Sequence, residues 1–234
     1  ITAENIAEKY KISRLEQDTF ALKSQEKVQN AITQNRFDEE IVKLQITNEN
    51  KKSILSKDEH PRNNLELEEL TKLKSVFKVN GTVTAGNASG INDGAAAVCL
   101  MTEREAKSRS INSLVKIVSW ANCGVEPSLM GLGPIQAISL ALEKANWKIE
   151  DIDLFEINEA FASQIIAVIK DLNIPHKKVN VNGGAIALGH PIGASGTRIL
   201  VTLIHEMIKQ DKKRGCASLC VGGGMGIAIC VERN

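Results

Sequence analysis

The stretch from Val179 to Arg198 contains residue types that could do chemistry. It holds five glycines together with His190 and Pro191, between a short β-branched run and an apolar pattern of helical spacing. Proline is favoured at the first position of a helix, so Pro191 predicts a helix start and places His190 at its mouth. The preceding Val179–Val181 predicts a strand. The carboxyl ends of strands in open α/β sheets are where ligands bind, so we interpret His190 as a candidate functional residue.

Two further polar residues follow predicted strands. Asn158 comes after the predicted strand Ile152–Ile157, and Cys220 ends the predicted strand Ala217–Cys220. A lone asparagine before a helix is usually a cap, and a lone cysteine before glycines usually belongs to the core. Parallel strands would nevertheless bring Asn158, His190 and Cys220 to one sheet edge. Their combination predicts a site there.

Three other motifs fail on their spacing. Ser195 lacks the last glycine of the Gly-x-Ser-x-Gly hydrolase turn, because Thr197 occupies that position. The Gly-rich stretch Gly81–Gly94 lacks the Gly-Lys-Ser/Thr ending of a nucleotide loop, although its small residues would let backbone amides approach a ligand. Gly131–Pro134 lacks the third glycine of a dinucleotide loop.

Composition narrows the class of protein. The chain has 234 residues, 43% of them hydrophobic, and can bury the core of one large or two small domains. A net charge of +1 offers no strong field for nucleic acid or an anionic membrane, and no apolar run reaches the ~18 residues of a membrane span. Five cysteines without Cys-x-x-Cys spacing favour a reducing compartment over disulfides or a zinc site. We therefore expect a cytoplasmic protein.

The remaining sequence predicts the elements that position these residues. Residues 1–35 predict two helices, the second opened by the capping box Ser13 to Glu16 with Phe20, Val28 and Ile32 as its buried stripe. Residues 48–66 predict an exposed loop and 65–77 a short helix. Further helices are expected at 134–146, 160–172 and 191–209, and strands at 41–47, 95–101, 114–120, 152–157, 179–181, 217–220 and 226–231. This alternation predicts an α/β fold with a mostly parallel sheet and an antiparallel last pair.

Three motifs together resemble the thiolase family, most closely its short-chain, acetyl-transferring type. They are Gly183–Gly196, Asn158–Ala162 and Cys220–Gly226, in the family's order and spacing. The resemblance covers the whole chain but only the later part of a thiolase. It implies mixed sheets and helices layered α/β/α/β/α, here incomplete. Residues 1–91 would be the remainder of the coenzyme A-binding loop domain, 92–111 the end of the N-terminal half, and 112–234 the C-terminal half.

The resemblance also implies an activity. Thiolases condense two acetyl-CoA molecules to acetoacetyl-CoA, or cleave that product in reverse. Cys220 would be the base, and the acid in reverse, as a thiolate near neutral pH. His190, kept neutral by a helix N-terminus, would form an oxyanion hole with a water held by Asn158. The backbone N–H of Gly222 would form half of a second oxyanion hole.

Binding roles carry over in the same way. Arg62 would meet the nucleotide end of coenzyme A, by phosphate pairing or by stacking. The remaining residues would flank the pantetheine (Ser89, Ala85 and Ala88) or close the acyl pocket (Met130, Ala160 and Phe161). The coenzyme A thioester is the substrate, so neither a metal nor a separate cofactor is expected. The expected partners are acetyl-CoA, acetoacetyl-CoA, coenzyme A and further copies of the chain in a homodimer or homotetramer.

One departure from the family pattern limits the activity of this chain. The nucleophilic cysteine, and the His-Met-Gly that should stand before Ile1, have no counterpart here. No motif identifies Cys99, Cys123, Cys216 or Cys230 as a replacement. We therefore expect the chain alone to be inactive. Two alternatives remain open: a longer-chain 3-ketoacyl-CoA thiolase, and a non-catalytic thiolase-like protein that binds coenzyme A. A mitochondrial location is the alternative to the cytoplasm.

Overall fold

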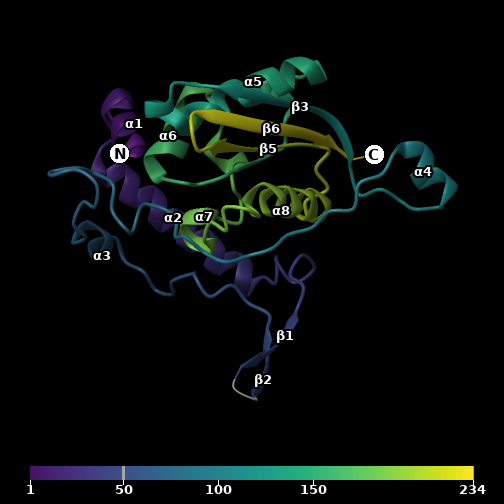
Figure 1. The fold of residues 1–234 in the computed structure, drawn as a ribbon, viewed down its shortest axis with the longest axis horizontal. Coiled ribbons are helices and arrows are strands. Elements are labelled where there is room, and N and C mark those ends of the chain that lie inside the picture. Colours follow the sequence, from purple (N-terminus) through teal and green to yellow (C-terminus); the bar gives the residue numbers. More distant parts are fainter. Residues whose placement is uncertain (49–50, 234) are drawn as a thin grey trace.

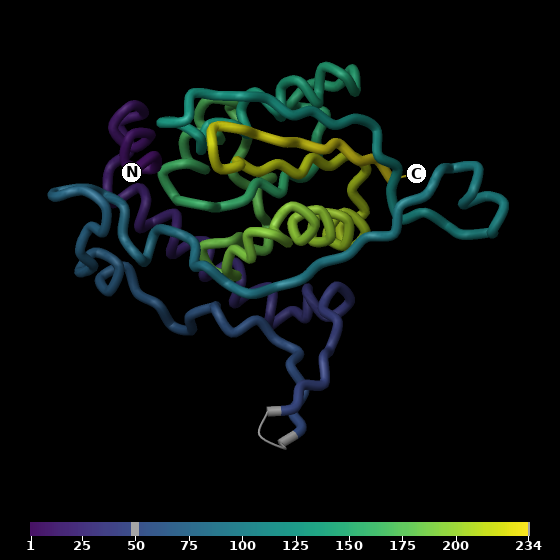
Figure 2. Tube along the Cα trace, in the orientation of Figure 1, coloured from purple at the N-terminus to yellow at the C-terminus, as the bar shows by residue number. Residues whose placement is uncertain are grey.

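The computed structural model describes residues 1–48 and 51–233 (Figures 1 and 2). Its strands are β1 (Leu44–Asn48), β2 (Lys51–Leu55), β3 (Lys116–Gly124), β4 (Leu154–Ile157), β5 (Arg214–Val221) and β6 (Met225–Glu232). Its helices are α1 (Thr2–Tyr10), α2 (Arg14–Thr33), α3 (Leu67–Thr71), α4 (Glu103–Ser108), α5 (Gly133–Ala145), α6 (Ala162–Asp171), α7 (Ala185–Leu188) and α8 (Ser195–Lys209). Short 3₁₀ turns lie at η1 (Pro127–Leu132), η2 (Ile149–Asp151) and η3 (His176–Lys178).

A mixed four-stranded sheet of order β3-β6-β5-β4 forms the centre. It confirms the α/β class, but "mostly parallel" was wrong for this sheet, because only β4 and β5 pair in parallel. The turn between β5 and β6 has only three residues, and such a short connection can join only antiparallel neighbours. The predicted strand 179–181 adds no fifth strand, since Val179 makes a single parallel bridge to Phe155.

Helices cover both faces of the sheet. Side chains of one face, including Phe155 and Cys216, pack with α5 and α6 in a buried cluster. Alternate side chains of the same strands, such as Leu154 and Ala217, pack against Leu203 and the rest of α8. Figure 1 shows β5 and β6 lying between α8 and the α5 side of the molecule. Because β4 and β5 are parallel, their carboxyl ends lie at the same edge of the sheet, where Asn158 and Cys220 are found.

The predicted helices at the N-terminus are present, and the capping box is confirmed. The Glu16 amide donates to Ser13 Oγ at 3.2 Å and the Ser13 amide donates to Glu16 Oε2 at 2.7 Å. The predicted apolar stripe was partly wrong: Val28 is buried, but Ile32 is 39% exposed. The buried face of α2 carries polar side chains instead, among them Asp18 and Ser24. Burying them requires hydrogen-bond partners, and these come from the loops around the candidate site.

The predicted loop 48–66 contains a strand. β2 pairs antiparallel with β1, with Leu44 opposite Leu55, and the two strands form an arm that projects from the body in Figure 1. Residues 49 and 50 lie outside the described residues. The polar composition of 48–66 led to the prediction of a loop. A projecting two-stranded ribbon faces water on both sides, so its strands can form without an apolar face.

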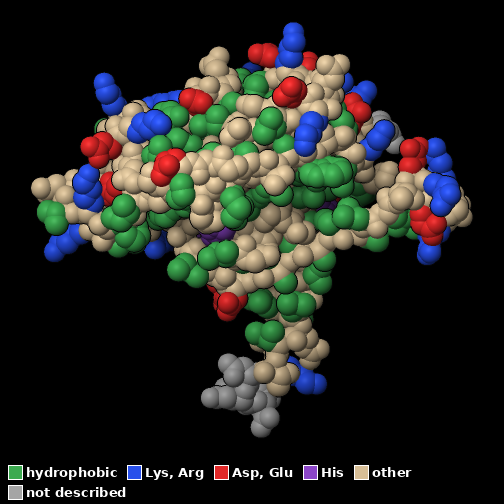
Figure 3. Space-filling model, turned by 45° about the horizontal axis from the view of Figure 1, so that its top comes forward, with side chains coloured by type: hydrophobic (Ala, Val, Ile, Leu, Met, Phe, Trp, Pro, Cys, Tyr) green, Lys and Arg blue, Asp and Glu red, His purple; other side chains and the backbone are tan. Residues whose placement is uncertain are grey.

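The buried strand predicted at 95–101 was also wrong. The described residues give it no strand partner, and Leu100 and Met101 are exposed. Trp120 on β3 and Ile227 on β6 are exposed as well, on the part of the sheet that α8 does not cover. Figure 3 shows hydrophobic side chains gathered across the middle of one face, with charged side chains around its rim. Residues 95–101 have the apolar pattern of a strand, but without a neighbouring strand their large side chains stay exposed to water.

Within the residues that the structure describes, we find no helix of sufficient length and apolarity to cross a bilayer.

Candidate active site

Asn158 and Cys220 lie at the carboxyl ends of the two parallel strands. Ile157 of β4 stands opposite Ser218 of β5, and the Asn158 amide continues this ladder by donating to the Ser218 carbonyl at 2.9 Å. Cys220 is two residues further along β5. The side chain of Asn158 is fully buried and Cys220 is 8% exposed. The predicted edge therefore carries both residues.

His190 comes to this edge through three contacts. Its Nε2 lies 3.3 Å from Asn158 Nδ2, and its Nδ1 lies 2.5 Å from Ser195 Oγ. Its backbone amide donates to Asn92 Oδ1 at 3.1 Å. The ring is thus held between the end of β4 and the first residue of α8. The structure brings His190 and Asn158 together at this edge as predicted, although residues 179–181 before His190 form a single bridge and not a strand.

The sequence predicted that a helix N-terminus directly after His190 keeps its imidazole neutral, and this cause was wrong. α8 begins at Ser195, not at Pro191, so His190 precedes the helix by a full turn of chain. Pro191 instead opens that turn, which its fixed backbone angle also suits. Burial first, and then the positive charge of Arg198, lower the pKa of His190. Both favour the neutral imidazole, which can still donate one hydrogen bond.

Cys220 also differs from the expectation of a thiolate near neutral pH. Burial raises the pKa of its thiol to about 11. An apolar environment disfavours the charged form, and no cation is placed to offset it within the described residues. The thiol form is therefore the ground state of Cys220 in this chain.

Gly222 begins the turn that joins β5 and β6. It is exposed, and a Cβ atom added to it would meet nothing within 4 Å. The next two glycines adopt positive φ angles of 91° and 93°, and a Cβ on Gly224 would lie 2.4 Å from the Val125 carbonyl. Glycine is required at Gly224 both by conformation and by the close approach of the chain. This turn presents backbone groups beside the end of β5.

A buried carboxylate next to Asn158 ties the surrounding loops together. Glu159 accepts from Ser24 Oγ of α2 at 2.7 Å, from Asn180 Nδ2 at 2.9 Å and from the Ile186 amide of α7 at 3.3 Å. A Cβ on Gly184 would come within 2.3 Å of this carboxyl group, so only glycine fits there. Glu159 therefore fixes Asn158 relative to the loop that leads to His190.

The second Gly-rich stretch lies along the start of α6. The amide and hydroxyl of Ser89 both donate to the Ala160 carbonyl, at 3.1 and 3.0 Å. Ala88 forms a bridge with Phe161, and Ile91 forms one with His190. The structure thereby places the predicted pantetheine residues against two of the predicted acyl-pocket residues. The third, Met130, lies on η1, which packs against α6.

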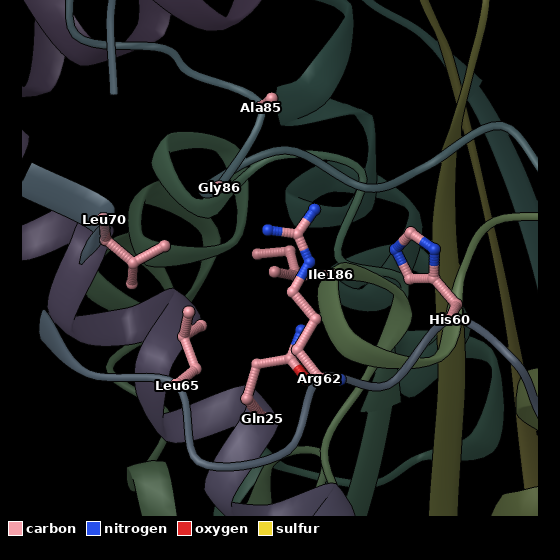
Figure 4. Close-up of a pocket in the computed structure, with 8 residues that line it drawn as sticks. All are labelled: Gln25, His60, Arg62, Leu65, Leu70, Ala85, Gly86 and Ile186. Atoms are coloured by element: carbon pink, nitrogen blue, oxygen red, sulfur yellow. Dashed lines mark hydrogen bonds between the residues drawn. The ribbon is translucent and has the colours of Figure 1, made fainter. Parts of the chain in front are cut away.

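Arg62 lies at a pocket formed by α2, α7 and the second Gly-rich stretch. Its amide donates to Gln25 Oε1 at 2.9 Å, and its guanidinium points into the pocket toward Ile186 (Figure 4). Ala85, which the sequence assigned to the pantetheine, lines the same pocket. The other lining residues are His60, Leu65, Leu70 and Gly86. Arg62 and Ala85 therefore line one pocket, whereas Ala88 and Ser89 lie outside its lining, against Phe161 and Ala160.

Sequence reasoning missed the roles of two residues that hold this arrangement, Asn92 and Ser195. Asn92 accepts from the His190 amide and its Nδ2 lies 3.4 Å from His60 Nδ1, so it links His190 to the pocket. Ser195 was considered only as a nucleophile and rejected. Asn92 lies inside the Gly-rich stretch, but its contacts reach residues 98 and 32 positions away, and no local signal predicts them.

Family models match both parts of the chain. The model described as "Thiolase, N-terminal domain" matches residues 1–104, and "Thiolase, C-terminal domain" matches residues 111–233. The division at 91 and 111 that the sequence suggested stays a prediction. Among curated relatives, the cytosolic acetyl-CoA acetyltransferase of Rattus norvegicus is 52% identical over 100% of this chain. The acetyl-CoA acetyltransferase of Rhizobium meliloti (strain 1021) is 54% identical over 100%. The chain spans 59% of the length of each.

The chain is also similar to solved structures of proteins named as acetyl-CoA acetyltransferases and thiolases. An acetyl-CoA acetyltransferase from Bacillus anthracis is 50% identical with a TM-score of 0.97, and the match covers 99% of this chain and 59% of that one. A human mitochondrial 3-ketoacyl-CoA thiolase in complex with CoA is 42% identical with a TM-score of 0.92, covering 100% and 58%. The match of both family models, the strand-end placement of Asn158 and Cys220, and the identity of half the residues to curated relatives lead to one conclusion: the chain belongs to the thiolase family.

Proposed function

We propose that the complete protein, meaning this chain together with the remainder of the fold that its relatives contain, is an acetyl-CoA C-acetyltransferase. It condenses two acetyl-CoA molecules to acetoacetyl-CoA and catalyses the reverse thiolysis. The observation that carries the proposal is the contact between His190 Nε2 and Asn158 Nδ2, which lie 3.3 Å apart. This contact lies at the sheet edge where β5 ends with Cys220 and Val221. The names of the relatives support an acetyl substrate.

In the thiolysis direction, an acyl-accepting cysteine from the rest of the fold attacks the ketone carbon of acetoacetyl-CoA. The bond between that carbon and the α-carbon breaks, and its electron pair becomes the enolate of acetyl-CoA. His190 and Asn158 stabilise the charge on the enolate oxygen. Cys220 then gives its proton to the α-carbon, for which the thiol form, with its pKa of about 11, is the required state. Coenzyme A then gives its thiol proton to the Cys220 thiolate and attacks the acetyl-cysteine as a thiolate. The first cysteine leaves as the thiolate that starts the next cycle.

In the condensation direction, Cys220 must first lose its proton. A thiolate whose conjugate acid has a high pKa is a strong base, which suits the weak acidity of a thioester α-carbon. The Gly222 amide serves the second oxyanion hole in this proposal. The exposed turn that carries it supports the assignment, because a Cβ atom added to Gly222 would meet nothing within 4 Å, which leaves open space beside the residue. Met130, Ala160 and Phe161 close the acyl pocket.

Coenzyme A binding is assigned to the pocket of Arg62 and Ala85 and to the strip formed by Ala88 and Ser89. Arg62 is exposed, so its guanidinium can pair with a phosphate or stack on adenine at the surface beside the pocket. The complex named for the human relative contains CoA, which supports this class of ligand. Assembly as a homodimer or homotetramer, and the absence of a metal or separate cofactor, stay predictions. The relatives include proteins named as cytosolic and mitochondrial, so the cytoplasmic location also stays a prediction.

Replacing Arg62 by Ala in the complete protein should weaken coenzyme A binding more than it slows chemistry. We expect KM for acetoacetyl-CoA to rise about tenfold, the scale of one charged hydrogen bond, with kcat changed less than about threefold. Steady-state kinetics measure both. Arg62→Lys keeps the charge but not the planar group. A KM close to that of the unchanged protein in this variant identifies phosphate pairing, and a KM as high as in Arg62→Ala identifies stacking. A fall in kcat with unchanged KM contradicts the assignment.

Chain-length preference separates the acetyl-specific enzyme from a longer-chain 3-ketoacyl-CoA thiolase. We expect kcat/KM of the complete protein to be highest for acetoacetyl-CoA and to fall at least about tenfold for a ketoacyl chain longer by several carbons, because a closed pocket rejects added methylenes. Thiolysis assays over a chain-length series measure this. A rising series assigns the protein to the longer-chain type, and saturable coenzyme A binding without turnover assigns it to the non-catalytic type.

A further inference from the structure

We propose that Ser195 is a positioning residue for His190: its hydroxyl donates a hydrogen bond to Nδ1 and thereby keeps the ring proton on Nε2. This inference rests on the proposed function for its catalytic meaning, because the oxyanion hole needs a donor at Nε2. The geometry itself does not depend on it. Ser195 is 1% exposed and is the first residue of α8, which places its Oγ directly beside the ring.

The serine hydroxyl has one proton and two neighbours that could accept it. His190 Nδ1 lies at 2.5 Å and the Pro191 carbonyl at 3.0 Å. If the proton goes to Pro191, Ser195 must accept from the ring, and the neutral ring then carries its proton on Nδ1. If the proton goes to the ring, Nδ1 is the acceptor and Nε2 carries the proton. The direction of this one hydroxyl therefore decides the tautomer.

The surroundings favour donation to the ring. The Pro191 carbonyl already accepts from the amides of Ala194 and Ser195, both at 2.8 Å, and a carbonyl oxygen has two lone pairs. It does not need the hydroxyl as a third donor. Nδ1 of His190, in contrast, has Ser195 as its one hydrogen-bond neighbour among the described residues. The shorter distance is also the one to the ring.

The other side of the ring accommodates a proton on Nε2. The Asn158 amide lies 3.3 Å from Nε2, and its Oδ1 has no hydrogen-bond partner within the described residues. A half-turn of the amide about its last bond exchanges oxygen and nitrogen, which have nearly the same shape. The Asn158 backbone stays fixed by its bond to Ser218 during this turn. With Oδ1 toward the ring, Nε2–H has a partner until a substrate oxygen arrives.

The two tautomers differ in what they offer a thioester oxygen. With the proton on Nε2, the ring donates a hydrogen bond to the charge that develops on the oxygen. With the proton on Nδ1, the ring presents a lone pair to that charge and repels it. Burial and the charge of Arg198 lower the pKa of His190, so protonating both nitrogens does not remove the choice. A wrong tautomer in an otherwise intact site can cost up to about 10⁴-fold in rate.

The test is Ser195→Ala in the complete protein. We expect kcat for thiolysis to fall about 10- to 100-fold, the range for loss of a group that orients a functional histidine, and KM to change less than about threefold. Ser163→Ala is the matched control. Ser163 is also fully buried in the first turn of a helix, and its Oγ donates to the Ala3 carbonyl at 2.9 Å. This control should keep its kcat, and an equal fall in both variants would mean a general loss of packing and overturn the inference.

The tautomer is read directly from nitrogen NMR of ¹⁵N-histidine-labelled complete protein. This chain contributes four histidines to the complete protein. The His190 signal is assigned by its loss in His190→Asn, and the signals of His60, His176 and His205 report whether each variant is folded. We expect Nε2–H for His190 in the unchanged protein and a shift toward Nδ1–H in Ser195→Ala. Nδ1–H in the unchanged protein, or Nε2–H alone in the variant, would overturn the role of Ser195. The spectrum needs no turnover, so an inactive protein with the expected pattern counts against the proposed function but supports this inference.

Discussion

Cys220→Ala in the complete protein is expected to abolish condensation and yet leave the first acetyl transfer intact. In the proposed mechanism the two steps use different cysteines, so removing the base does not remove the acyl acceptor. A positioned acid or base contributes about 10²- to 10⁴-fold, and the weak acidity of a thioester α-carbon places Cys220 at the upper end of that range. Alanine leaves a small void at the end of β5 without disturbing the ladder, since the backbone of β5 carries its hydrogen bonds to β4 and β6.

Two measurements separate the steps. Steady-state assays follow condensation, and mass analysis of quenched protein follows acetylation of the other cysteine by one acetyl group. Cys216→Ala is the matched control, because Cys216 lies on the same strand, is fully buried, and packs with the core cluster far from the strand end. It should retain most of the activity. If Cys220→Ala carries no acetyl group, Cys220 also serves the first transfer, and if it still condenses, Cys220 is not the base.

A polypeptide of residues 1–234 alone is expected to show no thiolase turnover and to associate or precipitate. No motif in it matches the acyl-accepting cysteine of the proposed mechanism, so the proposed oxyanion donors would have no covalent intermediate to stabilise. Trp120 is 64% and Leu100 69% exposed, and Leu114 and Ile227 add to the exposed apolar surface. β3 also ends the sheet with an unpaired edge within the described residues. Exposed apolar patches and free edges favour association.

Size-exclusion chromatography and a thiolysis assay on the purified polypeptide test both parts. Trp120→Lys should reduce association without producing turnover, because it changes the surface and not the site. This variant separates insolubility from inactivity. A soluble monomer that turns over acetoacetyl-CoA would identify an acyl acceptor among Cys99, Cys123, Cys216 and Cys230, which no motif predicted.

The predictable part of the site depends on short stretches of sequence. Asn158 follows the predicted strand 152–157 and Cys220 ends the predicted strand 217–220, and both predictions rest on local sequence patterns. Their position at one edge followed from the parallel pairing of β4 and β5 alone. The glycines of the three motifs likewise report local demands, such as the positive φ of Gly224. Motif order and spacing were therefore enough to identify the family.

Polar burial was not predictable from the same patterns. Ser24 and Asp18 of α2 read as solvent-facing residues, yet Ser24 donates to Glu159 at 2.7 Å and Asp18 accepts from Asn87 at 2.8 Å. A polar side chain can be buried only where a partner meets it, and these partners lie 69 and 135 residues away. The periodicity of apolar residues along a helix carries no information about such hydrogen-bonded pairs.

The sequence by itself determined which residues stand at the sheet edge, because strand ends and glycine turns are local properties of the chain. The tertiary structure decided their chemical state. Burial at the end of β5 raises the pKa of Cys220 to about 11, and burial with Arg198 lowers that of His190. The hydroxyl of Ser195 meets His190 Nδ1 only because Pro191 opens a turn before α8 instead of starting the helix. Protonation depends on solvent access and on charges from distant segments, and folding alone brings these together.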